Sequence, residues 1–459
     1  MRGRPVTNHE LAALITASGR SHAALARKVN VAAAARHGLD LRYDQASVYW
    51  WLRGRVPEEP IPGLLAGIFS EWLGLMIQMP DLGFTDPGGH LGLDMPATAA
   101  EAVESASELW RYVLRRRVFL GVGFGVGFAI GATVSAGFDW HFAPSPAAGG
   151  LARQAGPRTV GMADVERIRQ ARTEFAIMDH AHGGGHAFPW LVDYLDRELA
   201  PMLHGTYPAQ TGRDLFTAAS SLTELAGWMA YDQGKSHGLA QRFFIQALGL
   251  ARHAGDRAYG AHVVSDLATQ ALFLNHGAEA TRLARAAISG AGRAASPAQM
   301  ARLAAIEAQG FALTGDHRET RAAIRRADRA ADRSDPSDAP SWLASYTPAH
   351  QAGAVMHALR DLGQYRDAAR YADLVLELPA VNVRARALHT TLLATVQAGQ
   401  GEIDAACDTA SRALAAAPEL TSARLNARLR DFAQRISPYS DQVDAREYLE
   451  RSAATLPTA

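Results

Sequence analysis

Between residues 161 and 437 the chain repeats one pattern of small and apolar positions. A small residue is followed four positions later by a core residue, and three positions after that by another small or apolar residue. Offsets of four and three place these side chains on one face of a helix, where small residues let a second helix approach closely. We therefore expect successive helix pairs. The five copies are Ala240-Phe244-Ala247, Ala280-Ala284-Ala287, Thr320-Ile324-Ala327, Ala368-Ala372-Val375 and Ala406-Ala410-Ala413.

The spacing of these small residues resembles the tetratricopeptide repeat, whose second helix carries the pattern A-x3-F-x2-A. The copies recur at intervals of 40, 40, 48 and 38 residues, longer than the usual repeat of about 34 residues, and the tryptophan of the first helix is mostly missing. The resemblance implies an all-α solenoid of helix pairs with longer helices or loops. Chance recurrence in an Ala-rich chain is the alternative. Glycine-containing turns precede several copies, at Gly234, Gly277, Gly315, Gly363 and Gly401.

Two amphipathic helices are predicted within the first 60 residues. Ser21 supplies a hydroxyl suited to capping the first. Asp44 caps the second, Gly54 closes it and Pro57 prevents its continuation. The second helix is short and basic at its C-terminal end. These features are typical of a helix that enters the major groove of DNA. Its inward positions are Val48, Trp51 and Leu52.

This segment resembles the Xre class of helix-turn-helix domains, in which the recognition helix ends in a pattern matched here by Ser47, Trp51, Gly54 and Pro57. The resemblance implies that the outer side of the helix points at base edges and that neighbouring arginines neutralise phosphates. Trp51 is expected in the core. The base-facing residues would be Gln45, Ala46, Ser47 and Trp50, and the phosphate-facing residues Arg53, Arg55 and Arg27.

One feature departs from this class. The residues from Val29 to Arg42 separate the two motif helices, whereas the usual turn has about 3–4 residues. Either an insertion opens the motif, or its first helix is longer. The alternative interpretation of the whole segment is a small helical domain that binds another protein.

Charge supports a nucleic-acid partner only locally. The whole chain carries 46 basic and 46 acidic residues, so its net charge is zero. From Met1 to Val56, however, nine residues are basic and three are acidic. A net charge of +6 on a small domain suits phosphate contact.

The combination of both parts resembles actinobacterial transcriptional regulators with an Xre-type head and a tetratricopeptide-like body. Stretches that carry this resemblance lie at 183–187, 225–232 and 238–248. It implies binding to double-stranded DNA and control of development or secondary metabolism, and a related class binds signalling peptides in the repeat groove. A homodimer is a further possibility.

A candidate groove for a peptide, small-molecule or protein ligand combines aromatic and polar residues near the first repeat. Core packing, with Arg242 and Asp232 as an ion pair, is the alternative explanation. The candidate residues are Trp228, Tyr231, Asp232, Gln241 and Arg242.

An uncharged stretch from Val118 to Phe138 allows two interpretations. Its length suits a membrane span, which would make the protein a membrane-anchored sensor. Its many glycines lower helix propensity, and the alternation of glycine with large apolar residues from Phe119 to Gly127 suits an extended segment buried against the repeats. We expect the buried linker and a cytoplasmic protein, because the polar N-terminus also has no apolar signal-peptide region.

Few residues suggest chemistry. Cys407 is the single cysteine, which excludes a disulfide framework and a cysteine-rich zinc site. His180 and His182 lie in a glycine-rich stretch without neighbouring carboxylates, which favours a loop between helices over a metal site. Protease, hydrolase and phosphate-loop motifs are not found. We therefore expect neither an enzyme nor a cofactor.

These patterns predict an all-α protein in four parts: a helix-turn-helix domain over 1–85, a Gly/Pro-rich apolar linker over 86–160, a tetratricopeptide-like repeat domain over 161–437 and a tail over 438–459. A protein-interaction scaffold without DNA binding is the competing function.

Overall fold

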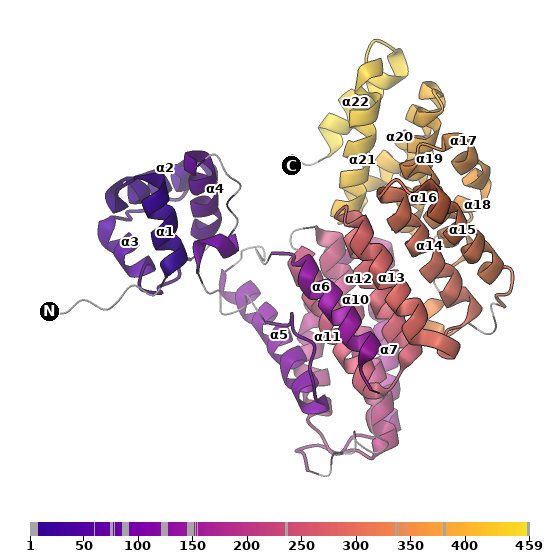
Figure 1. Cartoon of the computed structure of the whole chain (residues 1–459), viewed down its shortest axis with the longest axis horizontal. Helices are drawn as coiled ribbons and strands as arrows, with labels where there is room; N and C mark the ends of the chain where they lie inside the picture. Colours follow the sequence, from indigo (N-terminus) through magenta and orange to yellow (C-terminus); the bar gives the residue numbers. More distant parts are fainter. Residues whose placement is uncertain are drawn as a thin grey trace. The chain divides into compact units, whose positions relative to one another are not determined.

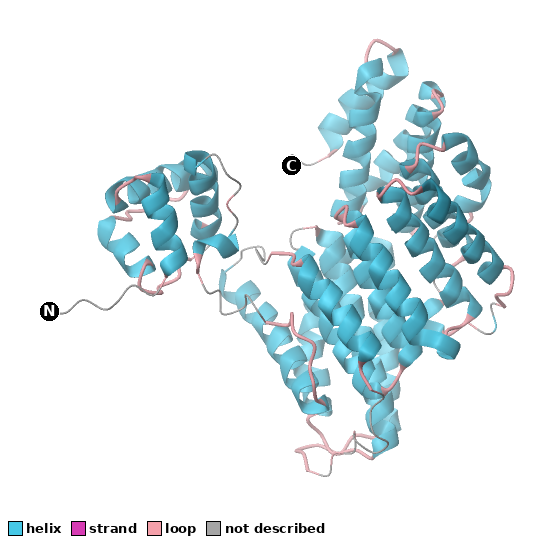
Figure 2. Ribbon diagram, in the orientation of Figure 1, coloured by secondary structure: helices cyan, strands magenta, loops and turns pink. Residues whose placement is uncertain are grey.

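The computed structural model describes residues 8–58, 60–73, 77, 79–84, 91–120, 127–144, 151, 153, 155–234, 237–335, 337, 339–344, 346–379 and 382–456. Within these ranges the fold is all-α, as predicted (Figures 1 and 2). Extended pairing there is limited to isolated bridges between Arg153 and Tyr207 and between Thr159 and Thr206. The chain forms two compact units, residues 1–91 with 119–127, and residues 92–118 with 128–459.

The first unit contains α1 (His9–Ser18), α2 (His22–His37), α3 (Gln45–Trp51), α4 (Ile61–Leu73) and a short 3-10 turn, η1 (Met79–Leu82). They pack around a core that includes Leu11, Leu25 and Phe69. Helix α2 continues to His37 before Gly38 ends it in the left-handed conformation, at φ 66°. The long separation between the two predicted helices is therefore explained mainly by a longer helix.

Successive helix pairs build the larger unit, which confirms the predicted helical-repeat body (Figure 1). The five predicted copies lie in the second members of their pairs, and apart from the partly exposed Ala372 every residue of the pattern is buried. The pairs are α10 (Ala209–Gln233) with α11 (His237–Ala254), α12 (Arg257–Phe273) with α13 (Gly277–Ala291), α14 (Pro297–Leu313) with α15 (His317–Ala331), α16 (Pro348–Asp361) with α17 (Tyr365–Ala368) and α18 (Ala372–Val375), α19 (Val383–Gly399) with α20 (Ile403–Ala416), and α21 (Ala423–Ile436) with α22 (Val443–Thr455).

The 48-residue interval between the third and fourth copies reflects a long connection from α15 to α16. This connection contains the 3-10 turn η5 (Ser341–Leu343). Trp342 in the turn packs against Tyr259 and His262 of α12, with ring centroids 5.4 and 4.7 Å apart. The additional residues thus contribute to the core of an earlier repeat.

Ahead of the first pair lie α7 (Met162–His182), α8 (Gly184–Tyr194), the π-helical segment η2 (Leu195–Leu199) and α9 (Ala200–Leu203). The loop predicted around His180 and His182 is wrong, because both histidines lie in α7 and only Gly183 separates α7 from α8. Gly183 has φ 84° there, and the Thr421 backbone donates a hydrogen bond of 3.1 Å to the carbonyl of His182. The start and the end of the repeat body are therefore in contact.

The segment predicted as a linker over 86–160 contains two helices, which the sequence analysis did not predict. Helix α5 (Ala99–Leu120) buries Ala102, Leu109 and Trp110. Helix α6 (Ile130–Phe142) packs on α11, α12 and α13, with the Trp140 ring against two glycines whose missing Cβ atoms leave room for it, Gly260 and Gly290. The expected tail after 438 also differs, because α22 packs on α20 and α21 as part of the body.

The uncharged stretch from Val118 to Phe138 is divided between the end of α5 and the start of α6, and residues 121–126 lie outside the described part. The extended conformation expected from Phe119 is wrong at residues 119 and 120, which are helical. None of the described helices combines the length and the apolar character needed to cross a membrane.

Candidate functional site

Helix α3 is held at its start by a reciprocal cap. The Asp44 carboxylate accepts a hydrogen bond of 2.9 Å from the Ser47 backbone, and the Ser47 hydroxyl accepts one of 3.3 Å from the Asp44 backbone. These bonds satisfy amides that a helix of seven residues would otherwise leave unpaired. They also lower the pKa of the Asp44 carboxyl.

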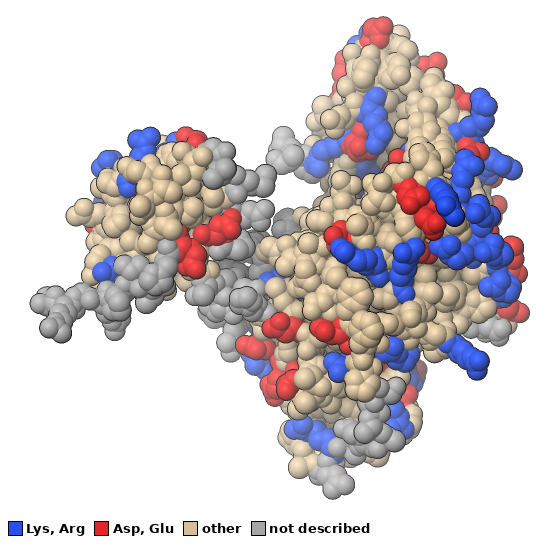
Figure 3. Space-filling model, viewed as in Figure 1, with Lys and Arg blue, Asp and Glu red and all other residues tan. Residues whose placement is uncertain are grey.

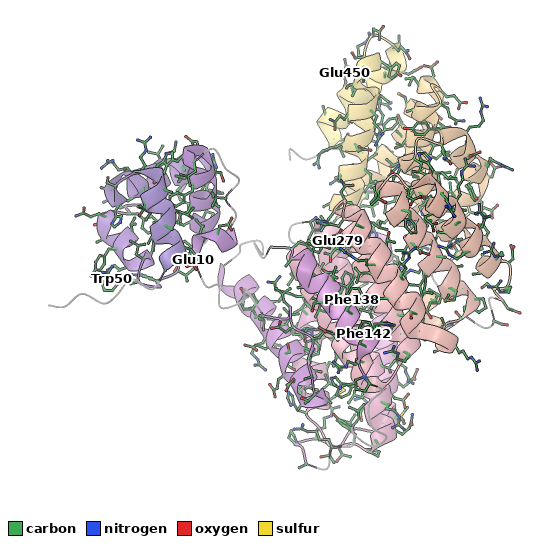
Figure 4. The ribbon with its side chains drawn as sticks, viewed as in Figure 1. Glu10, Trp50, Phe138, Phe142, Glu279 and Glu450 are labelled. Carbon is green, nitrogen blue, oxygen red and sulfur yellow. The ribbon has the colours of Figure 1, made fainter. Side chains whose placement is uncertain are left out.

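The two faces of α3 differ in exposure. Val48 and Trp51 are buried in the core, as predicted for Trp51. Tyr49 and Trp50 on the outer side are 37% and 44% exposed. Figure 4 labels Trp50 at the margin of the first compact unit, which is called the head below. Large aromatic side chains at the surface of a small domain are available for contact with a partner.

The predicted base-facing residues have different surroundings. Gln45, Ala46 and Trp50 are exposed on α3. Ser47 is half-buried, and its hydroxyl also donates to the Asp44 carboxylate at 3.1 Å. The structure therefore gives Ser47 a capping role within its own helix.

Of the predicted phosphate-facing arginines, Arg27 on α2 and Arg55 after α3 are exposed. Arg53 folds back onto its own helix. Its guanidinium lies 3.3 Å from the centroid of the Tyr49 ring and donates to the Tyr49 carbonyl at 3.1 Å. Stacking of this kind leaves the charge in place but restricts its position.

A hollow of about 580 Å³ lies between the end of α1, the start of α2 and the start of α3. The first amides of α2 carry the positive end of a helix dipole, which favours anions. Sequence analysis did not connect Arg20 and His22 with this place, although the Ser21 cap already located the start of α2. The hollow is lined by Ile15, Thr16, Gly19, Arg20, Ser21, His22, Ala23 and Gln45.

Comparison with known proteins gives one match. Residues 11–85 match the family model described as the SP15 N-terminal domain. This range contains most of α1 and all of α2, α3, α4 and η1. Neither a curated protein nor a solved structure matched the chain.

In the repeat body, three of the predicted groove residues lie on α10 and face α21. The Arg424 guanidinium of α21 lies 5.5 Å from the Trp228 ring centroid and 4.8 Å from that of Tyr231. The completely buried Asp232 accepts hydrogen bonds from Arg424 Nε at 2.8 Å and from Arg384 Nη1 at 3.0 Å. Burial raises the pKa of the Asp232 carboxyl, but Arg424 and Arg384 outweigh that effect and hold the pKa below its ordinary value.

The remaining two predicted groove residues contact other elements. The Gln241 side chain accepts from the Ala129 amide at 3.0 Å and donates to the Ala129 carbonyl at 2.6 Å, which fixes the start of α6. Arg242 donates to the Gly238 carbonyl at 2.9 Å. The structure thus brings Trp228, Tyr231 and Asp232 together but places Gln241 and Arg242 in a different set of contacts.

One buried group of acidic and imidazole side chains has the composition of a metal site, and sequence analysis missed it. Oxygen and nitrogen atoms of Glu224, His262 and Asp266 lie within 4.8 Å of one another. Guanidinium groups already contact all three side chains. Arg302 donates to Asp266 Oδ1 and to His262 Nδ1 at 2.5 Å each, and Arg172 lies 3.9 Å from Glu224. The sequence signal was the four-residue offset from His262 to Asp266 on one helix.

The imidazole of His262 also argues against a bound cation. Because Nδ1 accepts a hydrogen bond from Arg302, the ring proton belongs on Nε2, the atom that faces Glu224 and Asp266 at 3.9 Å. A protonated nitrogen has no lone pair for a metal. Burial, reinforced by Arg302, lowers the pKa of His262 well below its ordinary value. The His262 imidazole is therefore a neutral member of a polar core.

Proposed function

We propose that this chain is a DNA-binding transcriptional regulator. Its head would bind double-stranded DNA as an Xre-type helix-turn-helix domain, with α2 and α3 as the motif helices. Its helical-repeat body would sense a ligand or a partner, mediate dimerisation, or do both. The observation that carries the proposal is the geometry of the head, in which the exposed side of the capped helix α3 adjoins a hollow at the N-terminus of α2.

Each part of this surface suits one component of a duplex. The Gln45 amide can bond bidentately to adenine in the major groove, and Ala46 and Trp50 offer apolar contact to bases. The α2 amides and Arg20 at the hollow suit a phosphate, as do Arg27 and Arg55.

Charge alone does not carry the proposal. Figure 3 shows Lys and Arg side chains over the visible face of the body as well as the head. Helix α15 of the body alone exposes Arg318, Arg321, Arg325 and Arg329. Any test must therefore separate the head from this second basic surface.

The decisive experiment selects bound duplexes from fragmented genomic DNA with the full-length protein and measures their affinity by fluorescence anisotropy across salt concentrations. Arg55→Ala should weaken binding to all sequences and reduce the salt slope by about one. Gln45→Ala should instead change preference at one base pair, by about 1–3 kcal/mol. The matched control Arg325→Ala removes the same charge from the body and should leave both unchanged. Failure to enrich any sequence would remove the main support for this function.

A protein-interaction scaffold is the second candidate, favoured by the apolar exposure of the head. Val31 is 67% exposed and Trp50 44%, and exposed apolar side chains of this kind can also contact a protein partner. If this surface binds a protein, Trp50→Ala will abolish capture of that partner while Arg55→Ala leaves it intact. The regulator proposal expects both substitutions to impair DNA binding.

A further inference from the structure

One cluster of charged side chains in the repeat body holds one guanidinium more than its carboxylates can neutralise. Arg384 contacts Asp179 at 2.7 Å and Asp232 at 3.0 Å, and Arg424 contacts Asp232 at 2.8 Å. Arg360 contacts Asp361 at 2.5 Å. The cluster comprises the guanidinium groups of Arg360, Arg384, Arg424 and Arg428 and the carboxylates of Asp179, Asp232 and Asp361.

Arg428 is the surplus cation of this cluster. Among the residues that the structure describes, no carboxylate lies within ion-pairing distance of it. Its hydrogen bond of 3.2 Å goes to Nδ1 of His357 on α16. Burial first, and then Arg428 itself, lower the pKa of His357 well below its ordinary value, so the neutral imidazole accepts this hydrogen bond and carries no charge of its own.

The surroundings of Arg428 disfavour an isolated cation. Burial and the neighbouring Arg360 and Arg424 lower the pKa of Arg428 to about 10, despite opposing contributions from Tyr231 and Asp361. Removing one partner of a buried ionic group is strongly destabilising, which is why such charges are ordinarily paired. A negative group that approaches Arg428 would therefore gain an interaction that the folded chain does not supply.

The side chains around Arg428 are not fully enclosed. Arg428, His357, Arg424 and Trp228 are each partly exposed rather than fully buried. The guanidinium presents planar, forked donors that match the oxygens of a carboxylate or a phosphate. The aromatic face of Trp228 lies beside Arg424 in the same cluster.

We propose that Arg428 binds an oxyanion group, a carboxylate or a phosphate, of a ligand that enters the repeat body beside His357 and Trp228. This assignment rests on the sensing role in the proposed function and gives that role a ligand class. The bound group would bring the one negative charge that the cluster lacks. His357 would stay neutral, and the contacts of Asp232 would stay intact.

The test measures thermal unfolding of the full-length protein at constant ionic strength while sodium chloride is replaced by sodium phosphate or sodium acetate. We expect a saturable rise in the midpoint for wild type with at least one oxyanion, and the two arms distinguish phosphate from carboxylate. In Arg428→Met the apparent dissociation constant should rise by about tenfold or more, because a hydrogen-bonded ion pair is lost. The general stabilisation by phosphate is not saturable and affects every variant equally.

The matched control is Arg435→Met on the same helix, since Arg435 already has a carboxylate partner, Asp431, at 2.8 Å. It should keep the wild-type anion response. Arg428→Met should also unfold at a higher temperature than wild type in chloride alone, because it removes an uncompensated charge. An anion response equal in Arg428→Met and Arg435→Met, or no saturable response in wild type, would overturn the proposal.

If Arg428→Met fails to fold, Arg428→Lys provides the test of the oxyanion site. The ammonium keeps the charge but cannot bond bidentately, so the anion affinity should fall several-fold, and an unchanged affinity would contradict the assignment. DNA binding measured on the same proteins separates the two proposals. Wild type that responds to anions but binds no duplex would refute the regulator function while leaving the oxyanion site in place.

Discussion

The carboxylate of Asp232 in α10 and the guanidinium of Arg424 in α21 lie 2.8 Å apart, although 192 residues separate them in the sequence. Ser422 donates to the same carboxylate oxygen at 2.8 Å, and Arg384 donates to the other at 3.0 Å. Asp232 is completely buried, so this contact ties the last helix pair to the first through a carboxylate that is shielded from water.

The first prediction concerns the strength of this contact. Asp232→Asn removes the charge that Arg384 and Arg424 share, and we expect the free energy of unfolding of the body to fall by about 3–5 kcal/mol. Urea unfolding followed by circular dichroism at neutral pH measures the loss. Asp408→Asn is the control, because that carboxylate is exposed and lies 3.5 Å from Arg412 on the same helix; an equal loss in both variants would contradict the interpretation.

The second prediction concerns pH. The folded pKa of Asp232 is lowered, so its contribution to stability is complete above the unfolded carboxyl pKa of about 3.9 and is lost as the pH falls through the lower folded value. The difference in unfolding free energy between wild type and Asp232→Asn should therefore be constant near neutrality and shrink below about pH 4. Unfolding curves at a series of pH values test this, and a difference that grows on acidification would refute it.

Local patterns were sufficient to predict the repeated helices and the short helix of the head. The Ala240-Phe244-Ala247 spacing reports burial on one helix face, and the caps at Asp44 and Gly54 mark helix ends directly in the sequence. Both signals act over a few residues, so they can be recognised without knowledge of distant contacts.

The features that the sequence did not reveal depend on distant partners. Helix α6 contains Gly131 and Gly137, which lower helix propensity, but it is stabilised by Trp140 packing between Gly260 and Gly290 and by Gln241. The surplus charge of Arg428 becomes apparent only when the carboxylates around it are counted in three dimensions. Local hydrophobic periodicity contains no information on such pairings.

The third prediction tests the docking of α6. Trp140→Ala removes a fully buried indole, with a cost of about 3–5 kcal/mol to the packing of this helix. Hydrogen exchange of the amides from Ile130 to Phe142 should accelerate far more than exchange in α19. Trp50→Ala provides the comparison, since Trp50 is 44% exposed and its truncation should leave exchange in the head nearly unchanged. Unaltered exchange in α6 of the Trp140 variant would mean that the indole does not hold this helix.

The fourth prediction tests the hollow beside α2 and rests on the proposed DNA binding. If a phosphate occupies the hollow, Arg20→Ala should weaken binding to every duplex and lower the slope of log affinity against log salt by about 0.9, the value for one phosphate contact. Lys28→Ala is the matched control within the head, because its ammonium is paired with Glu71 at 2.9 Å and does not line the hollow. Fluorescence anisotropy from low to moderate salt measures both slopes. Equal slopes for the two variants would place the phosphate elsewhere on the head, even if Gln45 still determines base preference.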